Sequence, residues 1–490
     1  MEARERGLID RMCQPKGIAI FGAMSRPGSF GHAIMTSHTL YGYPGRIYPI
    51  SQRGDEVLGH RIYRSLEAVS GPVDLASISV PATEVPGVLR QCLDAGLAGA
   101  TIHTSGFAEA GAEGQALQDE IEEISRRGLK IIGPNCFGIH CPAGGTTFLP
   151  GFDFPKELGH VGMVFQSGGM ANDIIHEAAA TGVRFSKVFS FGNGCDLDAI
   201  RLLEYLAGDP ETHVIAAYLE GIGDGRRFLE VVRSITTEKP VLVWKGGLTP
   251  FGGRATLSHT GSLGGESEIW RAALRQVGAV AVEGAAELMD AMTAISYIKK
   301  PGRSVAIMGG GGATGVHLAD VAFRLGLEVP VFQPETQRRL NEILPMPGAG
   351  LANPLDMFTP TLPISQVIQL AETVVSQEPI DVLIAISLLH AIEINPKAFG
   401  KLLGIEFPGG EVYYDVLVDA FKRMKEQSGK EVVVVIENRG QRVEDLEAES
   451  IFRKTRLLFQ AAGIPVFADG ERALIGLNKA IQAQQHLGNA

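Results

Sequence analysis

One histidine stands in a stretch of small residues that suits covalent chemistry on a phosphoryl group. The stretch is SHTGSLGG (258–265), where His259 has serine, threonine and glycine around it. Small neighbours leave an imidazole accessible, and an accessible ring nitrogen can take up a phosphoryl group and pass it on. We expect a loop here, followed by an amphipathic helix that begins near Glu266. From these residues alone, a loop histidine with an ordinary hydrogen bond stays an open alternative.

Two glycine-rich turns could hold the negative charge of such a phosphoryl group. QSGGM (166–170) and GGGGATG (309–315) each follow an apolar strand and precede a helical pattern. The N-terminus of a helix carries unpaired N–H groups and partial positive charge, which together favour an anion. Glycine turns of this kind also arise for packing alone. The pair of turns together with His259 is the stronger indication, and it requires no metal site.

A third glycine-containing turn lies near the N-terminus and indicates a phosphate-bearing ligand. GAMSRPGSFG (22–31) follows the apolar run GIAIF and leads into a helix that we expect from about Ser29. Its spacing does not match G-x-G-x-x-G, and no acidic residue ends the next strand, RIYPIS. Arg46 and Arg53 stand in that region instead. These features disfavour NAD, although a plain strand-to-helix turn remains possible.

Short apolar runs alternate with helical patterns along the whole chain. Such alternation predicts parallel βαβ units and hence an α/β protein. The openings of the second and third series repeat one another, with nearly equal spacing from Gly168 to Gly182 and from Gly311 to Gly326. We therefore predict a Rossmann-like N-terminal domain followed by two flavodoxin-like doubly wound domains. The predicted boundaries are 1–145, 146–298 and 299–490.

Bulk composition narrows the class of protein. The chain has 490 residues, 45% of them hydrophobic and 20% charged, which is ordinary for a globular protein of roughly three domains. A net charge of -11 argues against a nucleic-acid-binding surface. Five dispersed cysteines without metal spacing fit reduced thiols better than disulfides. With no apolar run long enough to span a membrane and no apolar N-terminal leader, we expect a cytoplasmic protein without membrane contact.

The ordered motifs resemble those of the ADP-forming acyl-CoA synthetases, and in particular the α-type subunit of ADP-forming acetyl-CoA synthetases. The matching pieces include PKGIAIFGAMSRPGSFG, IIGPNCFGI, FQSGGM, YLEGIGDGRRF, SHTGSLGG and GGGGATGV. The same pieces are similar to the two subunits of succinyl-CoA ligase rearranged onto one chain. The resemblance runs from about Pro15 to about Gly470.

This resemblance implies roles for particular residues. It implies that His259 is the residue phosphorylated during turnover and that Glu220 orients its imidazole. The residues that it places around coenzyme A are Gly22, Ser25, Arg26, Pro27, Val80, Pro81, Asn135 and Cys136. The residues that it places around phosphate are Ser167, Gly168 and Gly169 at the first helix end and Gly310, Gly311 and Gly312 at the second. It also matches Asn353, Pro354 and Asp356 to a motif for which the sequence gives no physical role.

The implied activity is an acid–CoA ligase that interconverts acyl-CoA, inorganic phosphate and ADP with acid, CoA and ATP, through acyl phosphate and phosphorylated His259. The ATP-grasp module of full-length relatives is not recognisable in this sequence. We therefore expect a separate ATP-grasp β-type subunit that supplies ADP/ATP and Mg²⁺, within a hetero-oligomer. An alternative is a CoA-binding or acyl-CoA-binding protein without ligase activity, and a third, disfavoured, is a dehydrogenase. No feature identifies the carboxylic acid, the nucleotide preference or the direction of the reaction.

Overall fold

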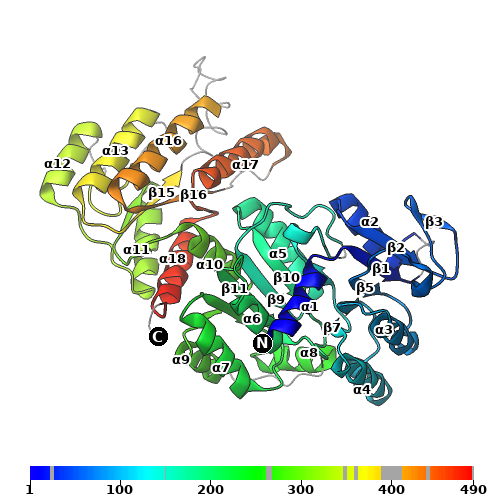
Figure 1. Ribbon diagram of the computed structural model, residues 1–490. Helices are drawn as coiled ribbons and strands as arrows, with labels where there is room; N and C mark the ends of the chain where they lie inside the picture. Colours follow the sequence, from blue (N-terminus) through cyan, green and yellow to red (C-terminus); the bar gives the residue numbers. More distant parts are fainter. Residues whose placement is uncertain are drawn as a thin grey trace. The chain divides into compact units, whose positions relative to one another are not determined.

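The computed structural model describes residues 1–22, 27–148, 150–260, 267–345, 350–357, 362–387, 411–437 and 442–487. The side chains of 255, 257–260 and 411–413 are outside this description. Contacts within the chain divide it into two units (Figure 1). The N-terminal unit comprises Met1–Ala179, Arg184–Gly284 and the residues from His486, and the C-terminal unit comprises Ala180–Val183 and Ala285–Gln485.

The first sheet of the N-terminal unit is entirely parallel, with the strand order β2-β1-β5-β6-β7. Its strands are β1 (Gly17–Phe21), β2 (Arg46–Ile50), β5 (Leu75–Ile78), β6 (Gly99–Ile102) and β7 (Lys130–Ile132). Its connecting helices are α2 (Phe30–Tyr41), α3 (Val85–Asp94) and α4 (Ala112–Arg126). A small hairpin of β3 (Glu56–Val57) and β4 (His60–Arg61) follows β2. The short 3-10 helices are η1 (Leu66–Ala68), η2 (Ala82–Glu84) and η3 (Ala108–Ala110).

Local sequence explains why these elements begin and end where they do. Every residue of β1 is buried, as expected of a parallel strand covered on both faces. Helix α2 starts after Ser29, whose hydroxyl accepts a hydrogen bond from the N–H of His32 at 3.4 Å, and it ends at Gly42 with φ +85°. These are the usual start and stop signals of a helix. The helix predicted from about Ser29 is therefore confirmed.

The second sheet of the N-terminal unit has the order β13-β12-β11-β9-β10-β8, and its strands are parallel except for β8. The strands are β8 (Gly138–His140), β9 (Val161–Phe165), β10 (Phe185–Ser190), β11 (Val214–Leu219), β12 (Val241–Lys245) and β13 (Val280–Val282). The helices are α5 (Gly168–Thr181), α6 (Ala199–Ala207), α7 (Gly225–Thr236), α8 (Pro250–Thr260) and α9 (Ser267–Gln276), and η4 (Pro142–Gly144) follows β8. Because β8 comes directly after the first sheet in sequence, the chain from the first sheet completes the edge of the second.

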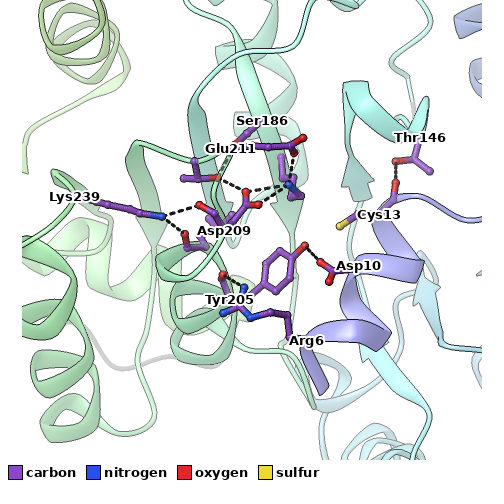
Figure 2. A network of polar contacts seen from close by, with 12 residues as sticks. Arg6, Asp10, Cys13, Thr146, Ser186, Tyr205, Asp209, Glu211 and Lys239 are labelled. Carbon is purple, nitrogen blue, oxygen red and sulfur yellow. Dashed lines mark hydrogen bonds and ion pairs between the residues drawn. The ribbon is translucent and has the colours of Figure 1, made fainter. Parts of the chain in front are cut away.

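An N-terminal helix, α1 (Ala3–Cys13), also joins the two sheets of this unit. Figure 2 shows Asp10 of α1 accepting a hydrogen bond from the hydroxyl of Tyr205 in α6 at 2.6 Å. Arg6 donates to the carbonyl of Tyr205 at 3.0 Å, and its guanidinium lies over the tyrosine ring. Helix α1 is not among the elements predicted from the sequence.

A buried ion cluster lies beside Tyr205. Lys187, in β10, is 3% exposed and donates to both carboxylate oxygens of Asp209 at 2.9 Å and to Glu211 at 2.7 Å. Although burial alone would lower the pKa of Lys187, its hydrogen bonds to Glu211 and Asp209 raise it above its usual value. Lys239 donates to the carbonyl of Asp209 at 2.7 Å, so the cluster connects β10 to the segments that precede β11 and β12 (Figure 2).

The C-terminal unit is built on a parallel sheet with the order β14-β15-β16-β17. Its strands are β14 (Val305–Met308), β15 (Val382–Ser387), β16 (Glu431–Ile436) and β17 (Val466–Phe467). Its helices are α10 (Ala285–Tyr297), α11 (Gly312–Arg324), α12 (Pro334–Ile343), α13 (Ile364–Gln377), α16 (Glu411–Ser428), η5 (Val443–Asp445), α17 (Leu446–Ala461) and α18 (Gly470–Gln484). Helix α18 packs along α10, where Arg472 pairs with buried Asp290 at 2.9 Å.

These sheets confirm the predicted fold class, an α/β protein with a Rossmann-like sheet followed by doubly wound sheets. Apolar side chains bury both faces of each sheet and form the cores. The predicted division at 145/146 and 298/299 stays a prediction. Within the ranges that the structure describes, none of the helices combines the length and apolar character needed to cross a membrane.

Candidate functional site

A cavity of about 550 Å³ opens in the N-terminal unit, where carboxyl ends of both sheets meet. Its wall brings together the predicted CoA-binding residues Val80, Pro81, Asn135 and Cys136 with the predicted phosphate-binding residues Ser167, Gly168 and Gly169. Residues more than 80 positions apart thus share one wall. Ligands of open α/β sheets bind at such carboxyl edges.

Hydrogen bonds between strand ends shape the part of the cavity wall that carries the predicted CoA-binding residues. The hydroxyl of Thr104, after β6, donates to the carbonyl of Val80, after β5, at 2.7 Å. The N–H of Asn135 donates to the carbonyl of Thr104 at 3.0 Å, and Asn135 has φ +60°, a conformation that asparagine tolerates better than most residues. The three strand ends are thereby fixed to one another.

The remaining predicted CoA-binding residues lie in or beside the turn after β1. Gly22 has φ +141°, and a Cβ atom there would lie 2.3 Å from the hydroxyl oxygen of Ser79, so only glycine fits. Pro27 is exposed. Among the described residues, neither Gly22 nor Pro27 lines the cavity. Ser25 and Arg26 lie outside the described residues.

Cys136 is a wall residue with an unreactive thiol. Its side chain is 3% exposed, and Sγ donates to the carbonyl of Ile102 at 3.3 Å. Burial raises the pKa of Cys136 to about 12, which keeps the thiol protonated at neutral pH. Because the thiolate is the nucleophilic form of cysteine, Cys136 can contribute shape to this cavity but no nucleophile.

The N-terminus of α5 forms another part of the cavity wall. The hydroxyl of Ser167 accepts from the N–H of Met170 at 3.3 Å and so caps the helix. A Cβ atom at Gly168 would lie 2.4 Å from Cγ of the Phe137 ring, whereas one at Gly169 would meet nothing within 4 Å. Gly168 is therefore required for packing, and Gly169 faces open space.

Glu220 follows β11 and is 6% exposed. The hydroxyl of Tyr218 donates to its carboxylate at 3.2 Å, and burial together with Glu220 raises the pKa of Tyr218. Two side chains hold the backbone of Glu220. Gln166, directly after β9, accepts a hydrogen bond from the N–H of Glu220, and the ammonium of Lys245, at the end of β12, donates to its carbonyl, each at 2.8 Å. Burial, only partly offset by the charge of Glu220, lowers the pKa of Lys245.

The backbone of His259 differs from the prediction. Pro250–Thr260 forms helix α8, so the backbone of His259 is helical, and the expected loop at 258–260 is wrong. The signal was present in the sequence, since Thr249 precedes Pro250 and its hydroxyl accepts from the N–H of Gly252 at 3.0 Å. The glycine-rich composition obscured it. The side chain of His259 and residues 261–266 lie outside the described part, and the next helix, α9, begins at Ser267, close to the predicted start.

The second predicted phosphate turn belongs to the C-terminal unit. Gly310 and Gly311 have φ +82° and +80°, and α11 begins at Gly312, as the helix-end prediction requires. Asn353 now has a physical role: its carboxamide accepts from the N–H of Ile307 at 3.0 Å and donates to the carbonyl of Val305 at 2.7 Å. It thereby provides hydrogen-bond partners for two backbone groups of β14.

The segment after Asn353 approaches the start of α11. A Cβ atom at Gly312 would lie 3.1 Å from a carboxylate oxygen of Asp356, and one at Gly315 would lie 3.1 Å from Pro354. The Asn353–Pro354–Asp356 motif therefore supports the glycine turn through β14 and α11 within the C-terminal unit.

The structure also adds wall residues that sequence reasoning missed. Burial lowers the pKa of His103 to about 4, so the ring is neutral at physiological pH. Its Nδ1 donates to the carbonyl of Cys136 at 3.0 Å, and its Nε2 therefore accepts from the hydroxyl of Ser77 at 2.8 Å. Asn193 donates to Glu109 at 2.6 Å and to Gln118 at 3.1 Å. No short motif marks these residues, since their roles come from contacts between distant segments.

The fold and this cavity define a protein in which a CoA-type Rossmann sheet and a flavodoxin-like sheet share one ligand cavity at their carboxyl edges. Two family models match the same regions: a CoA binding domain over residues 16–142 and a succinyl-CoA ligase like flavodoxin domain over residues 158–295.

Similarity to known proteins identifies the class of this chain more closely. The chain is 36% identical over 386 residues to the α subunit of ADP-forming acetate–CoA ligase II of Pyrococcus furiosus, covering 78% of this chain and 83% of the relative. It is 37% identical over 354 residues to ADP-forming acetate–CoA ligase I of Archaeoglobus fulgidus, covering 71% of this chain and 50% of the relative, so it spans about half of that longer protein. A solved acetyl-coenzyme A synthetase from Candidatus Korarchaeum cryptofilum, in complex with phosphate and ADP, is 28% identical with a TM-score of 0.78, covering 98% of this chain and 97% of that chain.

The chain therefore belongs to the family of ADP-forming acyl-CoA synthetases and is similar to their α subunits. The resemblance inferred from the motifs is confirmed. The chain is thereby assigned to a class of acid–CoA ligases, which handle CoA.

Proposed function

We propose that this chain is the CoA-binding, phosphohistidine-bearing subunit of an ADP-forming acid–CoA ligase. The observation that carries the proposal is the cavity that joins the predicted CoA residues to the N-terminus of α5, with Glu220 connected to the same wall through Gln166. A ligand there meets free backbone N–H groups on one side and the CoA-type strand ends on the other.

The proposed reaction has three transfers. An oxygen of inorganic phosphate attacks the thioester carbonyl of acyl-CoA, the carbon–sulfur bond breaks, and CoA leaves as its thiolate. A ring nitrogen of His259 then attacks phosphorus, and the carboxylic acid leaves as carboxylate. Phosphorylated His259 finally gives the phosphoryl group to ADP. A covalent intermediate divides one difficult transfer into two easier ones.

The residues of this chain stabilise charge in these steps. The N-terminus of α5, at Ser167, Gly168 and Gly169, supplies fixed N–H dipoles where phosphate charge must be held. Gly310, Gly311 and Gly312 would do the same at the second helix end. Glu220, fixed by Tyr218 and by its two backbone contacts, would balance the positive charge that the imidazole acquires.

The nucleotide step is assigned to a partner. We infer that a separate ATP-grasp β-type subunit binds ADP/ATP with Mg²⁺ and forms a hetero-oligomer with this chain. The naming of the P. furiosus relative as an α subunit supports this inference.

The test is incorporation of radiolabelled inorganic phosphate into the purified protein, supplied with a panel of acyl-CoAs, alone and with the candidate ATP-grasp partner. We expect acid-labile, base-stable label that is lost in His259→Ala while CoA binding stays within a few-fold. If no acyl-CoA gives label even with the partner, the chain is a CoA-binding protein without ligase activity. If His259→Ala also abolishes CoA binding, the assignment of His259 as the phosphoryl carrier is wrong.

A further inference from the structure

Gln166, the residue directly after β9, lies between the cavity and Glu220. Its side chain is 8% exposed and forms part of the cavity wall. Its carboxamide oxygen accepts two backbone hydrogen bonds, from the N–H of Glu220 at 2.8 Å and from the N–H of Gly221 at 3.2 Å. One side chain thus touches both the ligand space and the carboxylate-bearing turn.

These two bonds fix which end of the amide is which. Only the oxygen of a carboxamide can accept from a backbone N–H, so Nε2 must occupy the other position of the planar group. Among the described residues, Nε2 has no hydrogen-bond acceptor. Because Gln166 forms part of the cavity wall, this NH₂ group is a donor that a ligand atom in the cavity can use.

The neighbouring groups indicate what kind of ligand atom this is. The N–H groups of Gly168 and Gly169 open α5 and donate to no acceptor in the described part of the chain. Open space lies beside Gly169. Among the described wall residues there is no aspartate, glutamate, lysine or arginine. A site made of neutral donors at a helix N-terminus suits a compact oxyanion.

We propose that Gln166 binds the phosphoryl oxygens of inorganic phosphate and acyl phosphate through Nε2, and that the same amide holds Glu220 in place through Oε1. This inference rests on the proposed function and adds to it a contact that connects phosphate binding to the position of Glu220. Gln166 is a binding residue toward phosphate and a positioning residue toward Glu220.

Two substitutions separate the two ends of the amide. Gln166→Glu keeps an oxygen for the N–H groups of Glu220 and Gly221 but replaces the NH₂ donor by a second oxygen. Gln166→Leu removes both ends. Gln115→Glu is the matched control, because Gln115 is exposed on α4 and bonds only to Asp119 among the described residues.

The measurements are the KM values for inorganic phosphate and for acyl-CoA in the labelling reaction, and the affinity of the purified chain for inorganic phosphate by calorimetry. In Gln166→Glu we expect phosphate KM and Kd to rise at least about ten-fold, as for loss of a hydrogen bond to a charged group, while the acyl-CoA KM changes less than about three-fold. In Gln166→Leu the maximal labelling rate should also fall. Gln115→Glu should match the wild type.

An unchanged phosphate affinity in Gln166→Glu would overturn the inference, and so would equal increases in both KM values, which would mean that Gln166 only shapes the cavity. The binding measurement keeps this inference separate from the proposed function. Wild-type chain that binds phosphate through Gln166 but is never labelled would contradict the phosphohistidine mechanism alone.

Discussion

The adjacent glycines Gly168 and Gly169 allow packing and ligand space to be tested by the same substitution. A methyl group at Gly168 would lie 2.4 Å from Cγ and 2.5 Å from Cδ1 of Phe137, whereas one at Gly169 would meet nothing within 4 Å. Ordinary carbon contacts begin near 3.5 Å, so Gly168→Ala forces the ring of Phe137, a wall residue, to move by about 1 Å.

The two variants should therefore differ in stability. Overpacking of this kind costs about 1–3 kcal/mol, and for a unit of this size we expect the Tm of Gly168→Ala to fall by about 2 to 10 °C. Gly169→Ala lies in a helix with open space around it, so alanine should leave Tm unchanged or raise it slightly, by restricting the unfolded chain.

Phosphate affinity should distinguish the two variants in a way that stability does not. If the space beside Gly169 receives the anion, its methyl group displaces ligand, and Gly169→Ala weakens phosphate binding without loss of stability. Scanning calorimetry gives Tm, and phosphate titration of the same samples gives the affinity. A Gly169→Ala protein that is less stable than Gly168→Ala would refute the packing argument, and one that binds phosphate normally would refute the location of the anion.

Four further outcomes are expected. Glu220→Gln should slow labelling of the protein without lowering its Tm, and a normal rate in this variant would remove the orienting role. Lys187→Met should destabilise the N-terminal unit by about 3–5 kcal/mol, because Asp209 is left buried without its cation, and adding Asp209→Asn should recover part of the loss in chemical denaturation. Burial lowers the pKa of His140 to about 3, so between pH 6.5 and 3 the unfolded chain binds a proton that the folded chain does not. Stability should be full above about pH 6.5 and decline below it, and His140→Phe should make denaturation midpoints less dependent on pH over this window. Cys136 should resist iodoacetamide at pH 7 until the protein unfolds, as followed by mass spectrometry; rapid alkylation of folded protein would contradict its raised pKa.

Much of the fold could be predicted from the sequence because its signals are local. Apolar runs such as GIAIF, followed by glycine and a helical period, became β1 and the start of a βαβ unit. The predicted helix start near Ser29 was likewise confirmed by a capping hydroxyl. Helix α1 was not predicted, because its buried face consists of a few spaced residues in a strongly charged segment.

The site was less predictable, because its contacts join distant segments. Motif resemblance selected Asn135 and Gly168 as candidate residues, and the structure shows that both line one cavity. Nothing near Gln166 in sequence indicates that it accepts hydrogen bonds from Glu220 and Gly221, more than fifty residues away. The helix at 250–260 was missed although its signal is local. Thr249 caps its start, but the glycine-rich composition of the segment led to the prediction of a loop.

The joining of the two N-terminal sheets by β8 and α1 has a consequence for how such proteins can be recombined. A genetic cut near residue 145 would leave β8 on one fragment and its pairing partner β10 on the other, and would separate Asp10 from Tyr205. Both fragments would then expose apolar edges that are buried in the intact chain. Gene fission, fusion or domain shuffling in this family should therefore keep β8 together with β10, and α1 together with α6.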